Sequence, residues 1–254
     1  MALSELPLHF AIAGEDEAHY FVVTTVTDRI LAQHIAWLGD VIESCRIWCA
    51  SSDGRPWSLF TRARKEVRAR DLRSSLPTGH FGRGEPGQLD ARFARAQLHV
   101  WEDAHDRGER LDVVFIARDL DHKDERLLGL RQAITERPWP FVVALAWFQP
   151  EAEAWFVAGF EPRTDAERAA HAELRQELGF RPTEQPHRLL STRNDPVKDA
   201  KRVWAKLALG DHDARQRSLH ANVDVLRRNG AEIGVPEFID QLVEKVVPLF
   251  APTR

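Results

Sequence analysis

Apolar residues along the chain follow two alternating patterns. Short, nearly continuous apolar runs are typical of buried strands, and these are predicted over 8–13, 47–50, 111–117 and 141–148. Longer segments carry apolar side chains at intervals near 3.6 residues, which predicts helices over 16–38, 89–105 and 124–135. Strands that alternate with helices predict an α/β fold, with a mostly parallel sheet flanked by helices.

From about residue 151 onward the pattern is helical. Helices are predicted over 151–158, 164–178, 195–209, 213–228 and 236–250, with Gly210 and Gly230 as helix ends. A basic stretch over 55–73 also has a helical pattern, and the Gly- and Pro-rich residues 74–88 predict a loop. The chain is therefore predicted to consist of an α/β core over 8–160 and a helical C-terminal region over 161–254 packed on that core.

Composition narrows the class of protein. Of 254 residues, 43% are apolar, which is enough for a buried core. No apolar run approaches the roughly 18 residues that a membrane-spanning helix needs, and the N-terminus lacks the pattern of a secretory signal. Only Cys45 and Cys49 are present, which fits a reducing compartment. These features predict a cytoplasmic protein that does not enter a membrane.

The formal net charge is −4, but basic residues are concentrated in two stretches. Residues 55–73 contain seven basic and two acidic side chains, and residues 181–206 contain seven basic and three acidic ones. Two basic stretches around an acidic centre are typical of a metal enzyme that acts on a polyanion such as DNA or RNA. Solvated helix faces explain the same charges equally well.

Acidic residues follow two of the predicted strands. Glu15, Asp16 and Glu17 come directly after the strand over 8–13, at the start of a helix, where Asp16 is expected to be the N-cap. Asp119 and Asp121 follow the strand over 111–117, and side-chain alternation in an extended segment would direct both to the same side. Paired carboxylates of this kind suit Mg²⁺ or Mn²⁺.

These motifs resemble the Toprim domain, which combines a glutamate after its first strand with an Asp-x-Asp after a later one. The segment Pro150-Glu151-Ala152-Glu153-Ala154-Trp155 is similar to the Pro-x-x-Glu-x-Trp element of small Toprim-like proteins that are distantly related to the overcoming-lysogenisation-defect nucleases. Leu226–Gly230, with Gly234 and Phe238, is similar to a later pattern of the same group. The resemblance covers mainly residues 8–160.

The resemblance implies a Toprim-like fold and a metal-dependent nuclease. Asp119 and Asp121 would bind Mg²⁺ or Mn²⁺, and Glu15 would either bind the metal or act as the general acid or base. Glu153 would supply a further catalytic carboxylate. A gap-free overlay on the family's first motif favours Glu17 instead of Glu15, so that choice stays open. Lys198 and Lys201, spaced i and i+3, are candidates for stabilising the transition state, in competition with Arg118 and Lys123.

The resemblance also implies an antiviral-defence or DNA-repair effector that acts on DNA or RNA with an ATPase partner, because the chain carries no nucleotide-binding motif. It leaves homo-oligomerisation open. A non-catalytic Toprim-fold regulatory or scaffold subunit is the main alternative, and an enzyme acting on a small phosphorylated substrate is a third interpretation.

Three other patterns carry less weight. The Gly-x-Gly-x-x-Gly over 82–87 follows no strand, which disfavours dinucleotide binding. Cys45 and Cys49 lack the further ligands of a zinc site. Among eleven histidines, His19 and His122 are the two expected near the acidic site, although a structural role is the commoner one for a single histidine.

Overall fold

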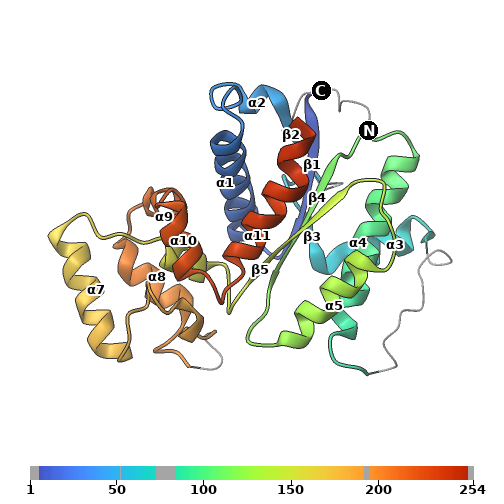
Figure 1. Cartoon of the computed structure of the whole chain (residues 1–254). Coiled ribbons are helices and arrows are strands. Elements are labelled where there is room, and N and C mark those ends of the chain that lie inside the picture. Colours follow the sequence, from blue (N-terminus) through green and yellow to red (C-terminus); the bar gives the residue numbers. More distant parts are fainter. Residues whose placement is uncertain (1–5, 52, 73–83, 192–194, 251–254) are drawn as a thin grey trace.

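The computed structural model describes residues 6–51, 53–72, 84–191 and 195–250. Within these residues five strands form one parallel sheet (Figure 1). The strands are β1 (Leu8–Gly14), β2 (Arg46–Trp48), β3 (Ser58–Leu59), β4 (Val113–Asp119) and β5 (Val142–Phe148). Their order is β2-β1-β4-β5, and β3 pairs with the end of β1. The predicted α/β fold with a mostly parallel sheet is confirmed; β3, two residues long, was not predicted.

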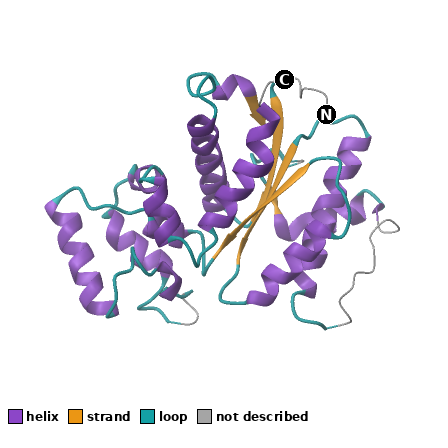
Figure 2. Cartoon of the chain, viewed as in Figure 1, coloured by secondary structure: helices purple, strands orange, loops and turns teal. Residues whose placement is uncertain are grey.

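Helices cover both faces of this sheet (Figure 2). The described α-helices are α1 (Glu17–His34), α2 (Ile42–Cys45), α3 (Ala63–Ala69), α4 (Gln88–Asp106), α5 (Asp124–Thr135), α6 (Glu153–Ala158), α7 (Asp165–Leu178), α8 (Ala200–Ala208), α9 (Ala214–Leu219), α10 (Val223–Asn229) and α11 (Val235–Gln241). α1 and α11 pack on one face, and α3, α4 and α5 lie on the other (Figure 1). The fold is therefore a three-layer α/β arrangement followed by a helical C-terminal region.

Side-chain alternation along the strands divides the core between the two faces. In β1, Phe10 and Ile12 pack with α1, whereas Ala11 and Ala13 pack with α4. In β4, Phe115 belongs to the α1 side. Strands buried on both faces read as continuous apolar runs, which explains why β1, β4 and β5 could be predicted from the sequence.

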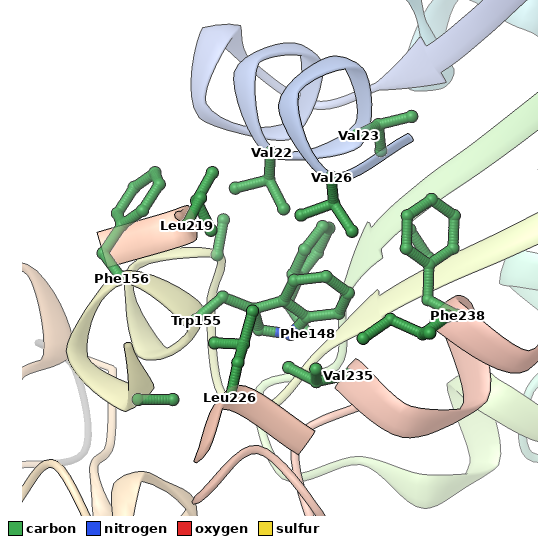
Figure 3. Close-up of a cluster of buried hydrophobic side chains, with 14 of the residues drawn as sticks. Val22, Val23, Val26, Phe148, Trp155, Phe156, Leu219, Leu226, Val235 and Phe238 are labelled. Atoms are coloured by element: carbon green, nitrogen blue, oxygen red, sulfur yellow. The ribbon is translucent and has the colours of Figure 1, made fainter. Parts of the chain in front are cut away.

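The core on the α1 side continues into the helical C-terminal region. Figure 3 shows its centre, where Val22, Val23 and Val26 of α1 meet Phe148, Trp155, Phe156, Leu219, Leu226, Val235 and Phe238. Trp155 is fully buried, and its Nε1–H donates to the Ile233 carbonyl oxygen at 2.7 Å. One apolar cluster thus joins residues on both sides of position 160, and the domain boundary there stays a prediction.

Several predicted helices differ in extent from the observed ones. The helix predicted over 16–38 ends at His34, and the stretch predicted as helical over 55–73 holds β3, a 3₁₀ turn and the short α3. The helix predicted over 213–228 is two helices, α9 and α10, because Asn222 caps a new N-terminus by accepting from Asp224 N and Val225 N. The helix predicted over 195–209 begins only at Ala200, with Asp199 as its N-cap. Beyond α11, the region predicted as one helix to 250 continues as a π-helical turn and a 3₁₀ turn. The loop predicted over 74–88 falls mostly outside the described residues.

The outer edge of β5 is closed by the C-terminal segment. The Gln241 side chain accepts from Leu145 N at 3.0 Å through Oε1 and donates through Nε2 to Leu145 O at 3.0 Å. The Lys245 ammonium donates to Val143 O at 3.4 Å. Because an uncovered edge strand invites pairing with other chains, these side chains take the place of a further strand.

Candidate functional site at the carboxyl edge of the sheet

The carboxyl ends of β1, β4 and β5 meet at one edge of the sheet (Figure 1). Glu15 and Asp16 follow β1, Asp119 is the last residue of β4, and Glu151 and Glu153 follow β5. In parallel α/β sheets this edge is where ligands bind. Acidic side chains from three separate parts of the sequence therefore lie at the place where the fold favours a site.

Asp119 is held firmly on the α1 side of the sheet. Its Oδ1 accepts a hydrogen bond from His19 Nε2 at 2.9 Å and another from Ala152 N at 3.0 Å. The side chain is 14% exposed. Side chains alternate along a strand, so Asp119 points to the same face of the sheet as Phe115, which lies four residues earlier and packs on the α1 side. Asp119 is thus oriented by groups from α1 and from the segment after β5.

Glu151 and Glu153 are buried beside Asp119. The Oε2 atom of Glu151 is buried without a hydrogen-bond partner among the described residues, and the Lys201 ammonium lies 3.5 Å from it. Burial raises the pKa of Glu151 to about 7; Lys201 opposes this effect, whereas Glu153 and Asp119 add to it. Burial likewise raises the pKa of Glu153, against the opposing effect of Lys201. The carboxylates of Asp119, Glu151 and Glu153 therefore lie near one lysine, Lys201.

Lys201 enters the site from α8 of the C-terminal region. Burial alone would lower the pKa of Lys201, but Glu153, Glu151 and Asp119 raise it above its ordinary value. Its side chain is 53% exposed, so the ammonium lies at the boundary between the carboxylates and solvent. Of the two predicted lysines, Lys201 is the one beside the carboxylates. The hydrogen bonds that place Lys198 are made by its backbone, with Asp195 and Leu190.

Glu15 and Asp119 point away from each other. The Glu15 carboxylate pairs with Arg118, whose Nε donates to Asp90 Oδ1 at 2.8 Å and whose guanidinium lies over the Phe60 ring. Arg118 precedes Asp119 in β4, so alternation sends it to the α4 side. Burial lowers the pKa of Arg118 to about 10, with a further contribution from Arg126, and the guanidinium stays charged at neutral pH.

The Asp121 carboxylate also has a different partner from that of Asp119. Its Oδ2 accepts from Arg126 Nη1 at 2.8 Å, and the same Nη1 donates to the Asp119 carbonyl oxygen at 2.9 Å. The prediction that Asp119 and Asp121 share a side assumed extended backbone through both residues. That assumption is wrong, because β4 ends at Asp119 and the next turn places Asp121 at φ 50° and His122 at φ 56°.

The three predicted metal ligands therefore have three different partners: Arg118 for Glu15, His19 for Asp119 and Arg126 for Asp121. In the part of the chain that the structure describes, no three His, Cys, Asp or Glu side chains form a group that could hold a metal ion. The alternative first-motif acid, Glu17, is exposed as the first residue of α1. Asp16 is the helix N-cap, as predicted, and accepts from Ala18 N and His19 N.

Two members of the site had weak signals in the sequence. Glu151 stands two residues before Glu153, and the resemblance to the Pro-x-x-Glu-x-Trp element pointed to Glu153 alone. His19 is four residues after Glu15, and that helical spacing lets Glu15 N donate to His19 Nδ1 at 2.9 Å. His122 links the turn after β4 to Gln149 and to the Leu189 carbonyl oxygen, rather than to the carboxylates.

Three of the six basic side chains that the structure describes in the first predicted stretch form ion pairs. Arg55 and Arg62 lie beside Asp53, and Arg70 pairs with Glu66 and Asp103. Such pairing is expected of solvated helix faces. A substrate path along this stretch stays a prediction.

A scan of protein-family models, a search of curated proteins and a search of solved structures each gave no match to this chain. Among its described helices, none combines the length and apolar character that crossing a bilayer requires.

Proposed function

We propose that this chain is a metal-dependent nuclease whose active site is formed by Asp119, Glu151, Glu153 and Lys201. The observation that carries the proposal is Glu151. Its Oε2 is buried without a hydrogen-bond partner among the described residues, beside two further carboxylates at the carboxyl edge of the sheet. Its pKa is raised to about 7. A carboxyl group with a pKa near neutrality in such a position is typical of a general acid or base.

The carboxylate oxygens of Asp119 and Glu153 are of the chemical kind that Mg²⁺ and Mn²⁺ prefer, which supports the proposal, although the described side chains form no group of three that could hold an ion. Both hydrogen bonds that the described residues make to the Asp119 carboxylate go to Oδ1, which leaves Oδ2 available. Glu153 is 8% exposed, and burial disfavours its ionised form until a cation compensates for it. Asp119 and Glu153 would hold the cation, which when bound supplies positive charge for the phosphate oxygens. Glu15 and Asp121 are committed to arginines and are assigned no ligand role in this proposal.

The remaining groups have separate tasks. Glu151 would carry the transferred proton on Oε2, taking it from the attacking water or giving it to the leaving oxygen. Lys201 is half-exposed at the mouth of the site, so its ammonium would contact a non-bridging phosphate oxygen and stabilise the charge that develops there. A polyanionic substrate fits this arrangement because a phosphodiester would neutralise the lysine as it enters.

Cleavage assays test the proposal. The purified protein, alone and with a candidate ATPase partner, would be incubated with Mg²⁺ or Mn²⁺ and plasmid DNA, single-stranded DNA or RNA. We expect Glu151→Gln to lower kcat by about 10²–10⁴-fold, the usual contribution of a general acid or base. Glu161→Gln, at an exposed glutamate after α6, is the matched control and should keep wild-type activity. Wild-type protein that is inert on all three substrates would remove the proposal.

A non-catalytic scaffold is the second candidate, and one observation favours it. Two of the three predicted metal ligands, Glu15 and Asp121, are held in ion pairs with Arg118 and Arg126. Isothermal titration with Mn²⁺ separates the two candidates. A nuclease should bind the ion and lose affinity in Asp119→Asn, whereas a scaffold should bind no ion in either form.

A further inference from the structure

His19 is the most deeply buried polar group at the site. Its exposed fraction is 0%, although it lies in the first turn of α1, where most polar side chains reach solvent. The imidazole ring stacks on Phe148 of β5, with 4.8 Å between ring centres and 10° between planes. Both ring nitrogens have partners: Nδ1 meets Glu15 N at 2.9 Å and Nε2 meets Asp119 Oδ1 at 2.9 Å.

These two contacts fix the tautomer. A backbone N–H can only donate, so Nδ1 of His19 must accept from Glu15 and carries no proton. A second proton on Nδ1 would face the Glu15 N–H, and no acceptor would be left for that backbone donor. The geometry therefore describes a neutral ring whose Nε2–H donates to Asp119 Oδ1.

The same contacts fix the carboxylate of Asp119. Its Oδ1 receives two donors from different elements, His19 Nε2 from α1 and Ala152 N from the segment after β5. Two bonds to one oxygen leave the carboxylate a single orientation, with Oδ2 turned to the opposite side. Because the His19 ring is itself held by Phe148 and Glu15, it cannot follow Asp119 if the carboxylate rotates.

We propose that His19 is a positioning residue that holds Asp119 with Oδ2 presented to the cation. This inference rests on the proposed function. The Glu15 carboxylate faces Arg118, so what Glu15 supplies to His19 is its backbone N–H.

Two substitutions separate positioning from packing. His19→Phe keeps the ring and its stacking on Phe148 but removes both nitrogens. His19→Gln can place an amide nitrogen near the position of Nε2 and so keep a donor for Asp119. His99→Phe is the control, because His99 is also buried, at 5% exposed, but belongs to α4 and contacts Glu102.

For His19→Phe we expect kcat and Mn²⁺ affinity each to fall by about 10–100-fold, as is usual when a group supporting a metal ligand is lost. His19→Gln should recover most of this loss, and His99→Phe should keep wild-type kcat and Mn²⁺ affinity. A fully active His19→Phe, or a His19→Gln that is impaired as much as His19→Phe, would overturn the positioning role.

Nitrogen NMR of histidine-labelled protein tests the geometry without any activity. The signals absent from His19→Gln identify the ring. We expect Nε2 to be protonated and Nδ1 unprotonated at pH 7, with Nε2 shifting in Asp119→Asn. A proton on Nδ1 contradicts the inference whatever the activity. Wild-type protein that neither binds Mn²⁺ nor cleaves, yet shows the expected tautomer, would refute the proposed function and with it the cation-presenting role, while the His19–Asp119 contact would stand.

Discussion

Replacing Glu151 by glutamine should stabilise the protein at alkaline pH. Burial raises the pKa of Glu151 from its ordinary 4.5 to about 7 in the folded state. Between these values the folded protein keeps a proton that the unfolded chain has lost, so stability must fall as pH rises from 4.5 through 7. At about 1.4 kcal/mol for each pH unit between the two pKa values, the ionised carboxylate costs the folded state about 3 kcal/mol at pH 8.

The neutral amide of Glu151→Gln avoids this cost. The pKa of about 7 already includes the attraction of the half-exposed Lys201, so the loss of this ion pair needs no separate correction. The variant should therefore exceed wild type by about 3 kcal/mol in the free energy of unfolding at pH 8. At pH 5 the wild-type glutamate is still protonated when folded, and the penalty is under about 1 kcal/mol.

Urea unfolding at pH 5 and pH 8, in EDTA to exclude divalent ions, measures the difference. Glu161→Gln is the control: as an exposed glutamate it should show no pH-dependent gain. Adding Mg²⁺ at pH 8 should raise the stability of the wild type, because a cation compensates for the buried carboxylates. A Glu151→Gln protein no more stable than wild type at pH 8, or equally stabilised at both pH values, would refute the electrostatic reasoning.

Three further substitutions test the fold. In Gly129→Ala a Cβ would lie 2.1 Å from the Gly87 carbonyl oxygen and force α4 and α5 apart. Urea unfolding should therefore show that the free energy of unfolding falls by about 1–3 kcal/mol, and an unchanged midpoint would contradict that contact. Trp155→Phe removes a buried N–H donor and should lower the unfolding free energy by about 1–3 kcal/mol, which calorimetry can check against wild type. Gln241→Ala exposes the N–H and C=O of Leu145, so sedimentation should detect association that the wild type lacks at equal concentration; identical sedimentation would count against edge closure.

The secondary structure of the core could be predicted because buried strands and helices have recognisable local patterns of apolar residues. β4 and β5 are apolar on both faces, and each predicted strand is confirmed to within a few residues. The N-cap at Asp16 was predictable for the same reason, since capping is decided within four residues. The break between α9 and α10 was missed because a helical apolar pattern continues across it, while the cap at Asn222 interrupts the backbone.

The side-chain partners at the site could not be read in this way. Whether Glu15 faces Asp119 or Arg118 depends on which side of β4 each residue occupies and on Asp90, which comes from a distant helix. The turn between Asp119 and Asp121 depends on a left-handed backbone conformation at a non-glycine residue. Such a conformation is uncommon and can rarely be predicted from sequence. Likewise Lys201 is distinguished from Lys198 only by where α8 begins, at Ala200.

The pH dependence of cleavage tests the central claim most directly. Initial rates of nucleic-acid cleavage with saturating Mg²⁺ would be measured between pH 5 and pH 9 for the wild type, Glu151→Gln and the Glu161→Gln control. If Glu151 carries the transferred proton, the wild-type and control profiles should bend at the pKa of one ionising group, and Glu151→Gln should be slow and lack that bend. A Glu151→Gln enzyme that cleaves at the wild-type rate with the same pH profile would contradict the assignment of this carboxyl edge as the active site.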